Sequence, residues 1–218
     1  MTKALTTSIA AVLFGLFAVT TTAQANLITN GSFEDGDFVG NSDDTMVLPI
    51  GSTAMTGWTV VNSSLAWIGP ANPFSLSASQ GEYFLDLTDY DNVAPHGGVT
   101  QDIATIAGEL YRLTFDLGSS VQWGIPDSIM ASADLTSGIF TSTASGTDNW
   151  ESQFLDFIAT DSTTTITLTG FLGFQYIGLD NVSVEAQSQQ VPEPATLALF
   201  GVGLAGLAVI RRRRKAKA

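Results

Sequence analysis

The stretch LYRLTFDL, Leu110–Leu117, is the clearest structural signal in the chain. Its apolar side chains recur at every second position, at Tyr111, Leu113, Phe115 and Leu117. A period of two places them on one face of an extended strand, with the polar side chains on the other face. The stretch therefore predicts a β-strand that buries one face and leaves the other nearer to solvent.

Seven more segments with strand-like patterns lie on either side of this stretch, separated by turns rich in Gly, Ser, Thr, Asn and Asp. They are Trp58–Val61, Tyr83–Leu87, Gly98–Ile103, Ile129–Ala133, Trp150–Ala159, Thr163–Thr169 and Gly178–Val184. Helix-period stretches are lacking between Asn26 and Val184, and that length suits one hydrophobic core rather than two. About eight short strands separated by turns predict an all-β sandwich.

Charge is distributed unevenly along the chain, which has 8 Lys and Arg, 21 Asp and Glu, and a formal net charge of -13. Between Asn26 and Gln190 the only Lys or Arg is Arg112, whereas 20 of the acidic residues lie there. Such a body would repel a phosphate backbone, so we expect no nucleic-acid partner. Divalent cations, Ca²⁺ above all, are the natural counter-partners because they bind hard oxygen ligands. The chain has no cysteine, which excludes disulfides, thiolate metal sites and cysteine nucleophiles.

The first 25 residues have the organisation of a secretory signal peptide (1–25). Lys3 precedes an apolar stretch of 11 residues, Ile9–Val19, and Ala23-Gln24-Ala25 fits a small-x-small cleavage site. An uncleaved membrane anchor is the alternative, but the apolar stretch is well short of the roughly 20 residues that a bilayer needs. We expect cleavage after Ala25, which would leave a mature body of residues 26–186.

The carboxyl-terminal segment is organised as a membrane anchor. After a linker (187–194), residues 195–210 carry no charge and predict a helix of roughly 24 Å at ~1.5 Å per residue. This is short for a hydrocarbon core of about 30 Å, so the transmembrane helix would be marginal. The basic tail (211–218) should stay cytoplasmic, which would place the body across the inner membrane.

The same segment resembles the PEP-CTERM sorting signal of Gram-negative bacteria. Val191-Pro192-Glu193-Pro194, a run of Gly, Ala and Leu, and a block of Arg occur in that order. The resemblance implies recognition of Pro192, Glu193 and Pro194 by an exosortase, removal of the hydrophobic tail, and delivery of the body to the cell surface or extracellular matrix. A plain tail anchor is the alternative, but it would not need the Pro-Glu-Pro triplet.

The body resembles the choice-of-anchor C family in the order of six segments. They are Asn26–Glu34 (NLITNGSFE), Thr56–Val60, Tyr83–Leu87, Gly98–Gln101, Tyr111–Leu117 and Leu179–Val184. That family is similar to the galactose-binding-like jelly rolls found among carbohydrate-binding modules. The resemblance implies a jelly-roll β-sandwich, whereas function has to be argued from a site.

Glu34 and Asp180 are candidate ligands of a structural calcium ion. The resemblance implies this role, because similar carbohydrate-binding modules use an early Glu and a late Asp in such motifs. Two carboxylates held close without a cation would repel each other, and a metal would offset that cost. The alternative is that both side chains cap turns or accept backbone N–H groups. Asn41, Asp43 and Asp44 form a second oxygen-rich stretch, which we interpret as a solvated loop because it lacks the ligand spacing of an EF-hand.

A polar loop between two predicted strands, Thr88–Gly98, and a later Trp supply the ingredients of a sugar site. An aromatic ring can stack on the apolar face of a pyranose, while short acids and amides accept its hydroxyl groups. The candidate ligand-binding residues are Trp123, Tyr90, Asp89, Asp91 and His96. Loop packing is the alternative role for Trp123 and Tyr90, and the sequence leaves open whether their loops meet.

No catalytic signature stands out, because His96 lacks a recognisable nucleophile elbow and one His cannot build a His-rich zinc site. Twenty acidic residues are compatible with a glycosidase carboxylate pair, but we expect no enzyme. The leading hypothesis is an exported, non-catalytic jelly-roll protein of the cell surface or extracellular matrix that binds exopolysaccharide. The alternative is a structural or adhesive coat protein that associates through divalent cations without a sugar site.

Overall fold

The computed structural model describes residues 25–90, 93–123, 126–143 and 146–187. None of these residues is helical, and they form eleven strands. The strands are β1 (Thr45–Leu48), β2 (Thr59–Val61), β3 (Leu65–Ile68), β4 (Phe84–Asp86), β5 (Gly98–Ala104), β6 (Leu110–Ser119), β7 (Ser128–Ala133), β8 (Thr136–Thr141), β9 (Asn149–Ile158), β10 (Thr163–Leu172) and β11 (Gly178–Ala186). All eight strands expected from the sequence are present, and β1, β3 and β8 are three more.

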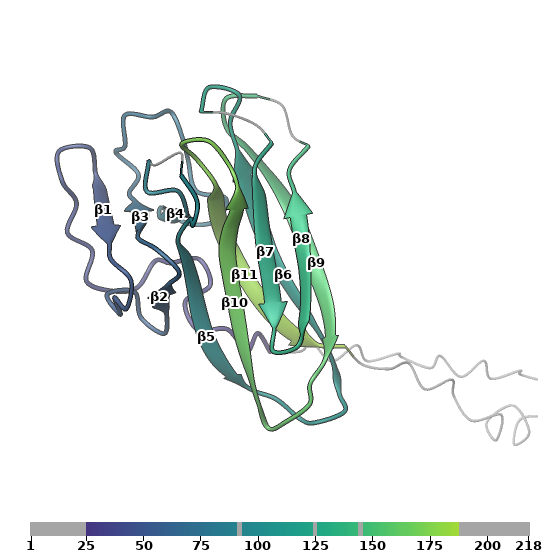
Figure 1. Cartoon of the computed structure of the whole chain (residues 1–218). Helices are drawn as coiled ribbons and strands as arrows, with labels where there is room; N and C mark the ends of the chain where they lie inside the picture. Colours follow the sequence, from purple (N-terminus) through teal and green to yellow (C-terminus); the bar gives the residue numbers. More distant parts are fainter. Residues whose placement is uncertain (1–24, 91–92, 124–125, 144–145, 188–218) are drawn as a thin grey trace, which may run out of the picture.

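The strands form two antiparallel sheets that pack face to face (Figure 1). The six-stranded sheet has the order β1-β3-β4-β11-β6-β9, and the five-stranded sheet has the order β2-β5-β10-β7-β8. Several neighbouring strands are far apart in the chain, as in the pairs β4 with β11 and β5 with β10, whereas the pairs β3 with β4 and β7 with β8 are consecutive. The expected all-β jelly-roll sandwich is confirmed.

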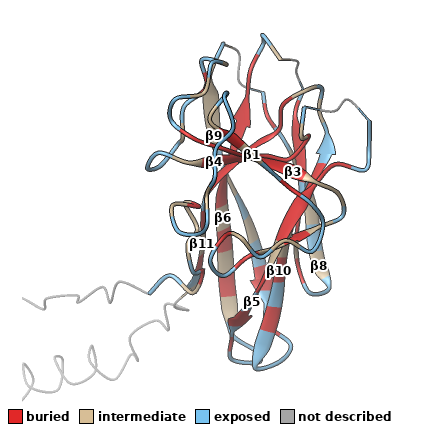
Figure 2. Ribbon diagram, turned by 90° about the vertical axis from the view of Figure 1, so that its left-hand side faces the viewer, coloured by how far each residue is buried: buried red, intermediate tan, exposed pale blue. Residues whose placement is uncertain are grey.

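The interior between the sheets is built from alternating side chains, as the sequence pattern predicts. On β6 the alternating residues Tyr111, Leu113, Phe115 and Leu117 are each 3% exposed or less. The facing sheet contributes Val60, Val99, Ile103, Ile129, Ala131, Ile166 and Leu168 to the same cluster. Figure 2 shows this alternation as bands of buried and exposed residues along β10.

The six-stranded sheet is also partly covered on its other side, which we call the outer face. A second apolar cluster lies there and consists of Ala66, Ile68, Leu76, Phe84 and Tyr176. Leu76 belongs to the connection between β3 and β4, residues 69–83, which we call the strap. The strap therefore shields the half of the outer face that carries this cluster, which we call the covered half. The half around Arg112, Thr114 and Ser183, which we call the open half, is only partly buried.

β3 has no alternating pattern because both of its faces are covered. Leu65 and Trp67 belong to the interior cluster, whereas Ala66 and Ile68 belong to the cluster on the outer face. All four residues are 1% exposed or less. A strand buried on both faces loses the polar positions that mark a half-buried strand, which is why the sequence pattern did not reveal it.

No helix within the described ranges is long and apolar enough to cross a membrane. The signal peptide apart from Ala25, the Pro-Glu-Pro triplet, the anchor helix 195–210 and the basic tail 211–218 lie outside the described residues. Their structures stay predictions from the sequence.

Candidate ligand-binding cavity

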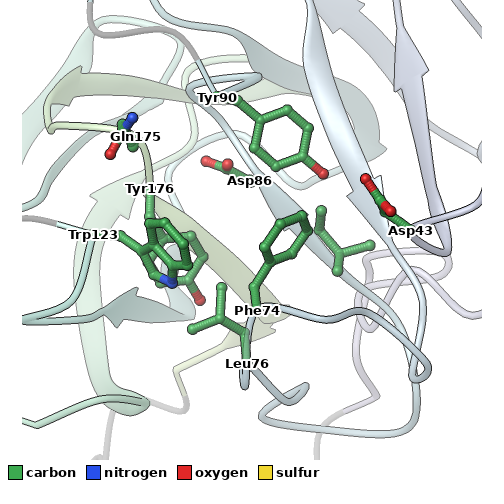
Figure 3. A pocket seen from close by; sticks show the side chains of 9 residues that line it. Asp43, Phe74, Leu76, Asp86, Tyr90, Trp123, Gln175 and Tyr176 are labelled. Carbon is green, nitrogen blue, oxygen red and sulfur yellow. The ribbon is translucent and has the colours of Figure 1, made fainter.

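A cavity of about 320 Å³ lies on the outer face, where the strap crosses the six-stranded sheet (Figure 3). The described residues that line it are Asp43, Ile68, Phe74, Leu76, Asp86, Tyr90, Trp123, Gln175 and Tyr176. They come from strands β3 and β4, from the strap and from four loops. The volume falls in the range of roughly 300–1,000 Å³ that is usual for small-molecule sites.

Strand alternation places Ile68 and Asp86 at the cavity, because Trp67 and Leu85 beside them point into the interior. Asp86 is 2% exposed. Its Oδ1 accepts hydrogen bonds of 3.0 Å from the Thr88 N–H, the Thr88 hydroxyl and the Ile177 N–H. Burial raises the pKa of Asp86 to about 6, although these hydrogen bonds act in the opposite direction. At neutral pH the carboxylate is therefore mostly ionised.

Tyr176 lies against two glycines that face each other in register on neighbouring strands, Gly118 on β6 and Gly178 on β11. A Cβ atom on Gly178 would lie 2.4 Å from the Tyr176 hydroxyl, and one on Gly118 would lie 2.6 Å from it. Any other residue would displace the ring. Tyr176 is 1% exposed, and burial raises its pKa well above the ordinary value, so the hydroxyl stays protonated.

Phe74 of the strap connects the aromatic walls of the cavity. Its ring lies 5.4 Å from the Tyr90 ring at 48° and 5.9 Å from the Trp123 ring at 86°. Tyr90 is 37% exposed. Partial burial, with smaller contributions from Asp86, Asp89 and Asp43, raises the pKa of Tyr90 to about 12, so it keeps its proton. The loops that carry Tyr90 and Trp123 thus meet through Phe74.

The backbone at the cavity adopts a conformation that bulky residues seldom take. Tyr90 has φ of 60° and Gln175 has φ of 65°, and Asp89 beside Tyr90 has φ of 52°. The left-handed region is costly for residues with a Cβ, and such residues concentrate at ligand sites and switch regions. Here the conformation positions two side chains that line the cavity.

The strap that carries Phe74 and Leu76 is held by carboxylates from other parts of the fold. Asp148 Oδ2 accepts the Ser77 N–H at 3.1 Å and the Ser77 hydroxyl at 2.5 Å. The Trp150 indole N–H donates to the Ser77 carbonyl at 2.9 Å. These contacts fix the strap directly after the segment that forms a cavity wall.

Further carboxylates hold the next residues of the strap. Asp116 on β6 accepts the Ser79 hydroxyl, and Asp180 on β11 accepts the Gln80 N–H at 2.8 Å. Glu34 Oε1 accepts the N–H groups of Glu82 and Tyr83, both at 2.8 Å. Ionised carboxylates are strong acceptors for backbone N–H groups. The cavity wall therefore depends on acidic residues that lie outside the cavity.

Residues 26–171 match the family model described as protein of unknown function (DUF642). The chain belongs to the DUF642 family. Residues 190–214 match the PEP-CTERM protein-sorting motif, which confirms the sorting signal expected from the sequence. The choice-of-anchor C resemblance stays a prediction, and no curated protein matches this DUF642 chain.

The fold of this DUF642 protein is similar to solved carbohydrate-binding modules. A family 61 module solved in complex with β-1,4-galactotriose is 19% identical, with a TM-score of 0.42, over 75% of this chain and 99% of the module. The CBM22-1 xylan-binding domain of Xyn10C from Paenibacillus barcinonensis is 14% identical, with a TM-score of 0.43, over 77% of this chain and 97% of the domain. A family 35 module from Clostridium thermocellum is 12% identical, with a TM-score of 0.42, over 64% of this chain and 97% of the module.

The candidate sugar-binding residues of this DUF642 protein divide into two groups. Tyr90 and Trp123 line the cavity together. Asp89 is half-buried beside Tyr90 and is outside the described lining, and Asp91 lies outside the described residues. His96 is 4% exposed, its carbonyl accepts the Asn62 side-chain amide at 2.7 Å, and it is also outside the described lining. The structure therefore brings the two aromatic candidates to one cavity, whereas His96 is outside its described lining.

Several lining residues were not identified from the sequence. Asp86 could have been found, because it is a polar residue inside the predicted strand Tyr83–Leu87. Phe74, Gln175 and Tyr176 lie in connections that have no periodic pattern, so the sequence gives no local signal for them. Asp43, which the sequence analysis placed in a solvated loop, is exposed but lines the cavity.

Glu34 and Asp180 of the DUF642 domain both contact the same part of the strap. Asp180 Oδ1 accepts the Asn181 N–H at 2.6 Å, and its Oδ2 accepts the Gln80 N–H. Burial raises the pKa of Asp180 to about 7. The described part of the chain contains no group of three His, Cys, Asp or Glu residues placed to hold a metal. Glu34 Oε1 and both Asp180 oxygens accept backbone N–H groups in this arrangement, and calcium binding stays a prediction.

Proposed function

We propose that this DUF642 protein is exported, is processed by an exosortase at its PEP-CTERM motif, and binds polysaccharide at the cell surface or in the extracellular matrix. The binding site is the cavity on the outer face, and we expect binding without cleavage. The signal peptide and the sorting motif support export from opposite ends of the chain.

The observation that carries the sugar-binding proposal is the mixture of side chains in the cavity. Tyr90, Phe74 and Trp123 supply aromatic surface for the apolar face of a sugar ring. Asp86 and Gln175 supply hydrogen-bonding groups for its hydroxyls. A purely structural cluster would not need this combination beside a cavity that opens to solvent.

Asp86 is better suited to binding than to acid–base catalysis. Its Oδ1 already accepts three hydrogen bonds that hold Thr88 and Ile177 in place. A glycosidase needs one carboxyl group to transfer a proton and a second to act as nucleophile or base. Asp86 is engaged in positioning the backbone, which supports a non-catalytic role.

Calorimetry with neutral oligosaccharides tests the proposal through Trp123→Ala. We expect up to about a tenfold loss of affinity, because an aromatic contact contributes roughly 0.5–1.5 kcal/mol beyond its buried area and about 1.4 kcal/mol corresponds to a factor of ten. Phe171→Ala is the matched control, since Phe171 is 50% exposed and lies outside the described lining. Equal affinity of wild type and Trp123→Ala would contradict the proposal. Calcium-dependent self-association without glycan binding would favour a coat protein instead.

A further inference from the structure

We propose that the cavity selects ligands that carry a positively charged nitrogen, and that its natural ligand is a polysaccharide containing protonated amino sugars. This inference rests on the proposed function, because it names the class of sugar that the same cavity takes. It excludes uronic acids and ranks neutral sugars below amino sugars.

The first argument is the charge at the cavity. Asp43 and Asp86 line it, and the only Lys or Arg between Asn26 and Gln190 is Arg112. The Arg112 Nε and Nη2 atoms donate to Asp156 at 2.6 and 2.7 Å, and its guanidinium lies 4.3 Å from the centre of the Phe154 ring. The charge of Arg112 is therefore already paired.

Arg112 also lies far from the cavity along its strand. It is six residues before Gly118, which contacts Tyr176, and six residues of β-strand span about 20 Å at ~3.3 Å per residue. No Lys or Arg of the body can therefore receive a sugar carboxylate in the cavity. A uronate would meet two carboxylates there, whereas an ammonium group would be attracted by both.

The second argument is the arrangement of the aromatic rings. Phe74 meets Trp123 nearly perpendicularly, at 86°, and Tyr90 at 48°, so the rings face in different directions. Figure 3 shows Asp86 between Tyr90 on one side and Trp123 with Tyr176 on the other. Several ring faces around one acidic group form the kind of cage that binds ammonium ions, since each ring face carries negative potential.

The third argument is the burial of Asp86. The hydrogen bonds described for this carboxylate come from Thr88 and Ile177 and bring no positive charge to it. Burying an ionised carboxylate without a counter-charge is costly, and a cation in the cavity would offset that cost. A neutral sugar would hydrogen-bond to Asp86 but would not compensate its charge.

Calorimetry with three β-1,4-linked hexamers tests this inference on the full-length protein. The hexamers of glucose, N-acetylglucosamine and glucosamine differ only at C2, which carries a hydroxyl, an acetamide or an ammonium group. At a pH where the amine is protonated, we expect the glucosamine hexamer to bind about tenfold more tightly than the glucose hexamer. Equal affinity of these two would overturn the inference and leave the proposed function intact. Failure of all three hexamers and of other glycans to bind would overturn the proposed function itself.

Asp43→Asn separates local recognition from general attraction of a polycation to an acidic protein. Because Asp43 lines the cavity, we expect the substitution to reduce affinity for the glucosamine hexamer several-fold more than affinity for the glucose hexamer. Asp102→Asn is the matched control, because it removes one exposed carboxylate from β5 on the opposite sheet. Equal effects of the two substitutions would overturn the inference.

Competition with choline provides a second measurement on the wild-type protein, which does not depend on any variant folding. Choline chloride should displace the glucosamine hexamer more strongly than sodium chloride at the same ionic strength. Identical displacement by the two salts would contradict an ammonium site. Binding of choline without binding of the glucosamine hexamer would overturn the assignment to amino sugars. It would show that the cavity recognises a quaternary ammonium group instead.

Discussion

The two halves of the outer face are built from the same strands but differ in cover and charge. In the half with the cavity, Gly118 and Gly178 lie side by side without side chains, so Tyr176 packs on the sheet and the strap covers it. In the open half, Thr114 and Ser183 occupy the equivalent positions, and their hydroxyls hydrogen-bond at 2.6 Å. Side-chain size along one pair of strands thus decides where a loop can pack.

The pKa values of the acidic residues shift in opposite directions in the two halves. In the open half Asp156 is exposed, and its hydrogen bond with Arg112 lowers its pKa. In the covered half burial raises the pKa of Asp86 and Asp180. In the covered half the negative charge of Asp86 can be neutralised by a ligand. In the open half the charge of Asp156 is already paired with Arg112.

The largest effect that should distinguish the halves is the dependence of stability on pH. Burial raises the pKa of Asp86 to about 6 and of Asp180 to about 7. It also raises the pKa of Asp127, a fully buried residue directly before β7 of the five-stranded sheet, to about 8. The folded state therefore binds more protons than the unfolded state between these values and the ordinary carboxyl pKa of about 3.9. The stabilisation from protonation is complete below the unfolded pKa and is lost as pH rises through about 6 to 8.

Thermal unfolding across this pH range measures the effect. We expect the melting temperature to fall by several degrees between mildly acidic and mildly alkaline pH, with a slope of up to about 1.4 kcal/mol per pH unit for each group. Asp127→Asn should make the slope shallower, because Asp127 has the highest pKa of the three. A melting temperature that rises with pH would show that a bound cation or another group dominates.

A smaller effect should follow from adding one methyl group under Tyr176. In Gly178→Ala the new Cβ would lie 2.4 Å from the Tyr176 hydroxyl and 2.8 Å from Gly118 Cα, so the ring must move. Such overpacking costs about 1–3 kcal/mol, and affinity for oligosaccharide should fall as well. Ser183→Ala in the open half is the control, with an expected loss of less than about 1 kcal/mol. Urea unfolding that gives the same stability for both variants would refute the difference between the halves.

The smallest effect concerns two acids near the beginning and end of β9. Asp148→Ala frees the Ser77 N–H and hydroxyl and should cost about 1–2 kcal/mol. It should also speed amide exchange in the strap. Asp156→Asn breaks the exposed ion pair with Arg112 and should cost less than about 1 kcal/mol. An equal cost for both would mean that the Asp148 contacts do not hold the strap.

Strand alternation explains how much of the fold could be predicted. The LYRLTFDL stretch and Thr163–Thr169 show a period of two because one face of each strand is buried more deeply than the other. β3 lacks that period because Ala66 and Ile68 pack under the strap. β8, at the edge of the five-stranded sheet, has no fully buried residue and so gives only a weak signal.

The cavity could be predicted only in part, because it depends on contacts between distant segments. Tyr90 and Trp123 were identified by residue type and loop position. The role of Phe74 depends on the path of the strap, which acids on other elements fix. The position of Tyr176 depends on the pairing of Gly118 with Gly178, a register that no local pattern encodes.

Hydrogen–deuterium exchange with and without the tightest-binding oligosaccharide tests the central claim most directly. The cavity assignment predicts slower exchange in the strap around residues 72–79, in residues 88–90 and in residues 175–177 when the ligand is bound. The open half, including residues 112–114 and 183–187, should be unchanged. Protection confined to the open half, or the absence of protection with a ligand shown to bind, would contradict the claim.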